Sequence, residues 1–259
     1  MEQSRSLLEK NGVCIAAVSY DPQETLKNFA DTQRIGFPLL SDRDSAAIRA
    51  FGIFNMNIAP GLRAHGVPHP VEYLVAPDGT VIRKYFVPNY LHRVTGSAVA
   101  FQEFGVASED AAVITIQHGA LKVEIGLSSG RAFAGQELSF FAKFQLQPGW
   151  HTYGTPLPDA YTATSIVFED DKIIQQLFDL PKPESLTLPA LGETLPVFSG
   201  SFEGRGTVLL RFPLDSGRVA LHGKLRVQQC CETICEPPEA IPFELPVTLE
   251  PFLVATPKK

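Results

Sequence analysis

The stretch "KLRVQQCCETICEPPEAIPFELPV", Lys224–Val247, joins two short apolar runs through a segment that holds three of the chain's four cysteines. Short apolar runs bounded by turn residues are typical of β-strands. Cys230 ends the first predicted strand, and Cys235 lies just before Pro237, Pro238 and the second strand. Two strand ends that face each other across a short turn can bring their α-carbons within the roughly 4.4–6.8 Å that a disulfide requires.

Three interpretations of this cysteine cluster compete. A zinc site usually needs four Cys, His or carboxylate ligands in paired short spacings, whereas this sequence offers one cluster with His222 as the only nearby histidine. A structural disulfide over so short a loop would add less than the ~3 kcal/mol estimated for a loop of about 15 residues. A redox-active pair needs only an accessible sulfur and an attacking thiolate. We therefore favour the redox pair, with the structural disulfide as the next alternative and no metal or other cofactor.

The composition sets limits on the partners of the chain. It has 259 residues, of which 44% are hydrophobic and 19% charged, enough apolar material for one or two cores. The net charge of -6 gives no reason to expect nucleic acid as a partner. No run of about 18 apolar residues occurs, so we expect no direct membrane insertion. The opening residues "MEQSRSLLEKNG" lack the apolar stretch of a signal peptide.

The sequence pattern changes near Ser108. Before that point, predicted strands such as "VCIAAVSY" alternate with predicted helices in the order βαβαββα, which is an α/β layer pattern. After it, short apolar runs are separated by Gly, Pro, Asp and Ser, which is typical of an antiparallel sandwich. We therefore predict two domains, residues 1–107 and 112–252, joined near "GVASEDAA".

The first half contains, in this order, "VCIAAVSYDPQETLKNFA", "FPLLSDRDSAAIRAFGI" and "PHPVEYLVAPDGTVIRKY". Over residues 4–104 these segments resemble the peroxiredoxin family, the AhpC/TSA group. The resemblance implies a thioredoxin-like fold. It also implies that Pro70, the proline ahead of the hairpin strand, follows a cis peptide bond and faces the active site. A cis bond is the minority state even before proline.

One part of the peroxiredoxin pattern is missing. The family has an initial strand and a Pro/Thr/Cys loop before the helix whose amino terminus lowers the pKa of the catalytic thiol, but this chain begins inside that helix. Cys14 lies within a predicted buried strand, where we expect a small core residue. We expect no peroxidase activity from the chain as given. Either Met1 is internal to a longer protein, with a signal peptide and the catalytic cysteine upstream, which we favour, or the domain is a scaffold that has lost its chemistry.

The second half contains "PGWHTYGTPLPDAYTATSIVFE" at 148–169 and "VQQCCETICEPPEAIPFELPV" at 227–247. Over residues 112–250 these motifs resemble the amino-terminal periplasmic domain of the thiol:disulfide interchange protein DsbD. The resemblance implies an immunoglobulin-like β-sandwich in a periplasmic or otherwise extracytoplasmic protein. It also implies partners, namely thiol/disulfide redox proteins and a membrane-embedded electron donor.

The same resemblance implies roles for individual residues. Cys230 and Cys235 would be the catalytic pair and form a reversible disulfide, with Cys235 forming mixed disulfides with partners. We expect Cys231 to point to the opposite face of the strand, because successive side chains alternate. The other candidates shield the disulfide or contact partners: Leu191, Val197, Phe198, Pro237 and Pro238.

Several neighbours of the cysteines need an interpretation. Glu232 and Glu236 flank them, and acidic neighbours raise the pKa of a thiol. We expect the pair to become active when a partner docks; a solvated acidic turn without function is the alternative. In "GWHTYG", we expect Trp150 and Tyr153 to pack in the sandwich and His151 to satisfy a backbone group.

These observations predict a two-domain extracytoplasmic redox protein, with a thioredoxin-like domain that lacks its first strand followed by an all-β immunoglobulin-like sandwich. The predicted chemistry is thiol:disulfide exchange and electron transfer. One alternative is a non-catalytic module that binds a redox partner and carries a structural disulfide. Another is a fragment of a longer peroxiredoxin-type peroxidase.

Overall fold

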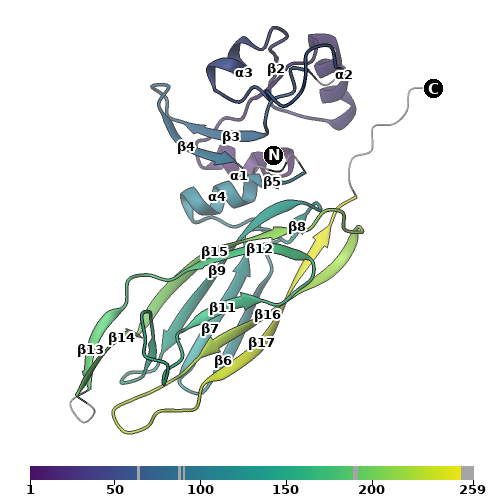
Figure 1. Cartoon of the computed structure of the whole chain (residues 1–259). Coiled ribbons are helices and arrows are strands. Elements are labelled where there is room, and N and C mark those ends of the chain that lie inside the picture. Colours follow the sequence, from purple (N-terminus) through teal and green to yellow (C-terminus); the bar gives the residue numbers. More distant parts are fainter. Residues whose placement is uncertain (63–64, 87–88, 90, 189–191, 252–259) are drawn as a thin grey trace. The chain divides into compact units, whose positions relative to one another are not determined.

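The structure of the chain is a computed structural model that describes residues 1–62, 65–86, 89, 91–188 and 192–251 (Figure 1). The chain divides into two compact units, Met1–Gly105 and Val106–Lys259. The predicted domains, residues 1–107 and 112–252, stay predictions. Within the described ranges, no helix has both the length and the apolar character needed to cross a membrane.

The first unit has the thioredoxin-like α/β class of fold that was predicted. Strand β1 pairs with β2 in parallel, and β3 pairs with β4 in antiparallel orientation. The last helix, α4, begins where the Thr95 hydroxyl accepts a hydrogen bond from the Ala98 N–H at 2.9 Å, the usual N-cap arrangement. The elements are η1 (Glu2–Ser4), α1 (Arg5–Lys10), β1 (Ala17–Ser19), α2 (Gln23–Gln33), β2 (Leu39–Ser41), α3 (Ala46–Ala50), β3 (Val71–Val75), β4 (Val81–Phe86), β5 (Arg93–Val94) and α4 (Gly96–Phe104).

An apolar cavity of about 490 Å³ is lined by residues of both β1 and β3, which belong to separate two-stranded sheets. The predicted buried strand over 13–20 is wrong in this respect. Only Ala17–Ser19 form a strand, Val18 is 45% exposed, and Cys14 is an exposed free cysteine. The physical reason is the cavity, because this segment borders open space where a buried strand would have a covering neighbour.

The predicted cis bond before Pro70 is also wrong. Among the described residues, cis peptide bonds precede Pro156 and Pro213, and the bond between His69 and Pro70 is not one of them. The trans form is favoured by about 0.5–1 kcal/mol at ordinary X-Pro bonds. Pro70 leads directly into β3 in a half-buried position, and the trans bond continues the chain into that strand.

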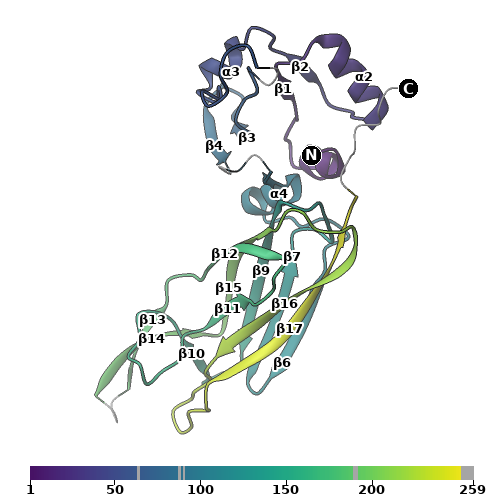
Figure 2. The ribbon, with the colours of Figure 1, turned by 45° about the vertical axis from the view of Figure 1, so that its right-hand side comes forward.

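The second unit is the predicted immunoglobulin-like β-sandwich (Figure 2). One sheet has the order β12-β15-β9-β7-β6, the other β11-β16-β17-β8, and a three-stranded sheet has the order β10-β14-β13. The strands are β6 (Val113–His118), β7 (Leu121–Leu127), β8 (Arg131–Ala132), β9 (Gln136–Leu146), β10 (His151–Tyr153), β11 (Ser165–Phe168), β12 (Ile173–Asp179), β13 (Glu184–Leu188), β14 (Glu193–Ser199), β15 (Ser201–Leu210), β16 (Gly217–Val227) and β17 (Glu239–Leu249).

The core of the sandwich follows from the alternation of side chains along its strands. In β16, Leu221 and Leu225 are fully buried, while His222 and Arg226, each of which follows one of them, are exposed. This period of two directs one set of side chains into the space between the sheets. Phe140 of β9 occupies the centre and packs against two further phenylalanine rings at centroid distances of 5.1 and 5.4 Å.

The three-stranded sheet determines where the cysteine loop lies. Figures 1 and 2 both place β13 and β14 at the end of the sandwich that also holds the loop between β16 and β17, and Figure 2 shows β10 beside them. Two backbone hydrogen bonds join β10 to this loop, from the His151 N–H to the Cys230 carbonyl at 2.8 Å and from the Cys230 N–H to the His151 carbonyl at 3.0 Å. The cysteine loop is therefore anchored to the body of the sandwich.

Leu138→Ala should destabilise the second unit by about 2–5 kcal/mol, because Leu138 is 0% exposed and truncation leaves a cavity in the core. The matched change Leu177→Ala, at a side chain that is 55% exposed, should cost less than about 0.5 kcal/mol. Urea titration followed by the fluorescence of Trp150, the single tryptophan, measures both. Equal losses from the two changes would contradict the assigned core.

Candidate functional site

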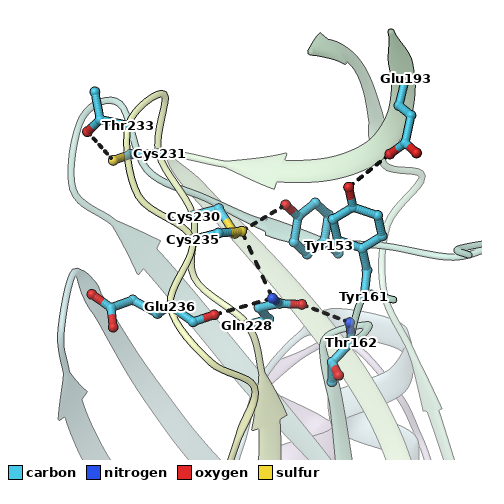
Figure 3. Close-up of a disulfide and its surroundings, with 10 residues drawn as sticks. All are labelled: Tyr153, Tyr161, Thr162, Glu193, Gln228, Cys230, Cys231, Thr233, Cys235 and Glu236. Carbon is cyan, nitrogen blue, oxygen red and sulfur yellow. Dashed lines mark hydrogen bonds between the residues drawn. A yellow bond between two sulfur atoms is a disulfide. The ribbon is translucent and has the colours of Figure 1, made fainter. Parts of the chain in front are cut away.

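The site is built around the disulfide between Cys230 and Cys235, whose α-carbons lie 4.1 Å apart (Figure 3). This pairing confirms the one predicted from the sequence. The two sulfurs have different surroundings, because Cys230, just beyond the end of β16, is 2% exposed whereas Cys235 is exposed. An attacking group from solvent therefore reaches Cys235 first.

Two hydrogen-bond donors are directed at Cys235. The Tyr153 hydroxyl lies 3.5 Å from Cys235 Sγ, and Gln228 Nε2 lies 3.9 Å from the same sulfur (Figure 3). Since a disulfide carries no S–H group, the tyrosine hydroxyl is the donor. Burial raises the pKa of Tyr153, with smaller contributions from Tyr161 and Glu193, so the hydroxyl keeps its proton at neutral pH.

Tyr153 and Gln228 are site residues that the sequence interpretation missed. Tyr153 was expected in the sandwich core, but it belongs to a separate cluster with Leu195, Val197 and Cys230. Gln228 has only its position beside Cys230 as a sequence signal. It is 7% exposed, and its amide accepts from the Thr162 N–H at 3.0 Å and donates to the Glu236 carbonyl at 3.2 Å, which ties the cysteine loop to a distant segment.

The disulfide opens onto a groove of about 1090 Å³. One wall is formed by the cysteine loop, and the floor by the three-stranded sheet, from which Tyr153, Leu186 and Val197 contribute side chains. The charged side chains in the described lining are those of Glu184 and Glu232. The groove is thus apolar at its floor and acidic where it carries charge.

The residues predicted to shield the disulfide lie in different places. Val197 is buried and packs in the cluster that contains Cys230. Phe198 stacks its ring on Phe202 with centroids 4.6 Å apart and is not among the described residues that line the groove, so shielding by this side chain stays a prediction. Leu191 lies outside the described residues.

Pro237 and Pro238 are both exposed and follow the cysteine loop. Pro237 borders a smaller hollow of about 340 Å³, and neither proline is among the described residues that line the groove. Contact of these prolines with a partner stays a prediction.

Cys231 points away from the disulfide, as predicted (Figure 3). Its sulfur lies 3.5 Å from the Thr233 hydroxyl. Hydrogen bonds from that hydroxyl and from the backbone N–H groups of Thr233 and Ile234 lower the pKa of the Cys231 thiol, and the nearby Glu232 opposes this only in part. The acidic neighbour therefore does not dominate at Cys231, while the expected effect of Glu232 and Glu236 on the pair of Cys230 and Cys235 stays a prediction.

His151 also lines the groove. It is 6% exposed, and burial lowers its pKa, so the imidazole is neutral at neutral pH. Its Nε2 has no hydrogen-bond partner among the described residues, so the predicted bond to a backbone group is not seen at this atom. No group of three or more His, Cys, Asp or Glu side chains suited to a metal occurs in the part of the chain that the structure describes.

Thr233→Val should raise the pH at which Cys231 becomes reactive, since valine keeps the shape of threonine but offers no hydroxyl to the thiolate. In the oxidised protein, the rate of iodoacetamide alkylation at Cys231, followed by peptide mass spectrometry across pH 6–10, measures this midpoint. Alkylation of Cys14 in the same samples is the internal control. An unchanged profile at Cys231 would show that the hydroxyl does not support the thiolate.

Comparison with known proteins places each unit in a class. Residues 1–84 match the AhpC/TSA family, and residues 126–246 match the family described as "Thiol:disulfide interchange protein DsbD, N-terminal". Both predicted resemblances are confirmed. The chain thus combines a thioredoxin-like, peroxiredoxin-related part with a DsbD-like immunoglobulin sandwich that carries a disulfide.

Individual relatives match parts of the chain. Peroxiredoxin Bcp of Escherichia coli (strain K12) is 32% identical over 74 residues, which cover 29% of this chain and 47% of that protein. Putative peroxiredoxin bcp of Haemophilus influenzae is 26% identical over 85 residues, or 33% of this chain and 54% of that protein. The chain spans about half the length of the curated relatives it matches.

Two solved structures are similar to the chain. The N-terminal periplasmic domain of ScsB from Proteus mirabilis has a TM-score of 0.41 and 17% identity, covering 55% of this chain and 52% of that one. The DsbD N-terminal domain from Neisseria meningitidis, in the reduced form, has a TM-score of 0.28 and 18% identity, covering 43% of this chain and 82% of that one.

Proposed function

We propose that the chain performs thiol:disulfide exchange through a reversible disulfide between Cys230 and Cys235. The observation that carries this proposal is the asymmetry of the pair, because one sulfur is buried and the other is exposed in a groove beneath two hydrogen-bond donors. A staple needs no such access, whereas exchange does. The match of residues 126–246 to the DsbD N-terminal family supports the same chemistry.

The proposed reaction begins at Cys235. A partner thiolate attacks Cys235 Sγ, a partner–Cys235 bond forms, and the bond to Cys230 breaks, so Cys230 leaves as a thiolate and takes up a proton. A second thiol of the partner then attacks the partner's own sulfur in this mixed disulfide. The products are the oxidised partner and a Cys235 thiolate, and the reverse sequence returns the electrons to a second partner.

Tyr153 and Gln228 would stabilise the charge that develops on Cys235. Hydrogen bonds to an ionised sulfur are stronger than those to a neutral one. Both donors already point at this sulfur in the oxidised protein, so they need little movement when the thiolate forms.

The proposed partners are thiol/disulfide redox proteins, with a membrane-embedded protein as the electron donor, and the proposed location is periplasmic. Two considerations support this assignment. Disulfides persist in oxidising compartments such as the periplasm, and the second unit matches a family of thiol:disulfide interchange proteins.

Thiol trapping tests the proposal. In a series of redox buffers, maleimide labelling should show Cys230 and Cys235 passing together from disulfide to dithiol at a potential above about -300 mV. A pair that stays oxidised below that potential would be a structural disulfide, and the binding-module alternative would then hold.

Two single substitutions give the matched control for the order of attack. In Cys230→Ser the exposed Cys235 should form a mixed disulfide with a small disulfide reagent, while in Cys235→Ser the buried Cys230 should react much more slowly. Equal rates would contradict the assignment of Cys235 as the sulfur that meets the partner.

Tyr153→Phe should slow the exchange by about 3- to 10-fold, because phenylalanine keeps the packing of the ring and removes a hydrogen bond worth roughly 1 kcal/mol. Stopped-flow reduction by dithiothreitol measures the rate. Tyr161→Phe is the matched control, since that hydroxyl donates to Glu193 and not to sulfur. A wild-type rate in Tyr153→Phe, or an equal decrease of the rate in both variants, would contradict the stabilisation of Cys235 by the Tyr153 hydroxyl.

A longer peroxidase is the second candidate, favoured by the match of residues 1–84 to the AhpC/TSA family. Cys14 is exposed and lines the cavity of the first unit. The described lining of this cavity contains no Lys, Arg or His side chain, and such groups activate a catalytic thiol. Cys14 therefore receives no catalytic role, and peroxidase activity of this chain is not proposed.

A further inference from the structure

The acidic residues around the disulfide groove carry no ion pair among the described residues. Several carboxylates elsewhere on the sandwich are paired with bases, namely Glu169 with Lys224 and Arg226, Glu203 with Arg205, and Glu250 with Arg131. Around the groove, within the described ranges, Glu184, Glu193, Glu232 and Glu236 form no ion pair. The charge there is left uncompensated.

The same groove contains a buried polar group without a partner. His151 lines it, is 6% exposed, and has no hydrogen bond at Nε2 within the described residues. That nitrogen is itself closed to solvent, so the groove meets an occupant with its exposed groups. The lining also includes Ile234, a large apolar side chain that is 54% exposed.

We propose that the groove selects a protein partner whose reactive cysteine is flanked by lysine or arginine. The proposal rests on the exchange function proposed above and names the chemical class of its partner. Glu184 on β13 and Glu232 on the cysteine loop both line the groove and supply the attraction. The apolar floor holds the backbone and side chains of the partner segment between them.

The charge of the partner affects both docking and chemistry. Two opposite charges at contact distance attract each other more strongly near a protein surface than in bulk water. Basic neighbours also lower the pKa of the partner's own thiol, which increases the fraction of attacking thiolate. An acidic thiol peptide such as glutathione gains neither advantage and is repelled by the two carboxylates.

Three blocked peptides test the proposal: acetyl-Lys-Cys-Lys-amide, acetyl-Ser-Cys-Ser-amide and acetyl-Glu-Cys-Glu-amide. Each reduces the oxidised full chain at low ionic strength, and acid-quenched maleimide labelling follows the opening of the Cys230–Cys235 bond. Each rate is divided by the rate of the same peptide on bis(2-hydroxyethyl) disulfide, which removes differences in intrinsic thiol reactivity. The basic peptide should be favoured over the acidic one by about 10-fold, and about 1 M salt should bring the ratio close to one.

Charge-neutralising variants connect the preference to the groove. Glu184→Gln and Glu232→Gln should each reduce the ratio between basic and acidic peptides. Glu244→Gln is the matched control and should leave it unchanged, because Glu244 lies on β17 beside His222 and is not among the described residues that line the groove. A ratio near one in the wild type, or an equal loss in the control, overturns the proposal.

The neutral Ser peptide distinguishes a failure of the basic-partner preference from a failure of the proposed exchange function. If the Ser peptide opens the disulfide while charge has no effect, exchange stands and the basic partner is wrong. If none of the three peptides opens a disulfide that dithiothreitol reduces in unfolded protein, the exchange function is wrong as well.

Discussion

The antiparallel pairing of β16 with β17 is the constraint on which the second unit depends. The register runs from Gly217 opposite Leu249 to Val227 opposite Glu239. A slip of one residue would turn the buried side chains of β16 toward solvent, so burial of the core fixes the register. The same register fixes where the two strands end, and therefore where Cys230 and Cys235 meet. Hydrophobic packing in the sandwich thus determines the geometry of the sulfur pair.

The parts of the fold that were predicted from the sequence depend on near neighbours along the chain. The strand–loop–strand pattern, the pairing of Cys230 with Cys235 and the opposite direction of Cys231 all follow from alternation and short spacing. The errors concern what covers a segment. Whether Cys14 is buried depends on a neighbour across a cavity, which no local pattern reports.

The donors that complete the site could not be read from spacing, because they come from remote parts of the chain. Tyr153 and Cys235 are 82 residues apart in sequence, and Gln228 and Thr162 are 66 apart. Such contacts depend on how β10 pairs with β14 and with the cysteine loop. The sequence therefore predicted only a packing role for the side chains of "GWHTYG". In the fold, the hydroxyl of Tyr153 lies within hydrogen-bond distance of Cys235 Sγ.

The backbone hydrogen bonds around the cysteine loop have a consequence for the dithiol state. The bonds between His151 and Cys230, from Cys231 to Ile234 and from Glu236 to Gln229 close the loop without any contribution from sulfur. Breaking the disulfide would leave these bonds in place, so the two thiols would keep a high effective concentration toward each other. The loop then works as a preorganised ring whose closure needs little conformational search, and electrons can enter and leave with small reorganisation of the surrounding sandwich.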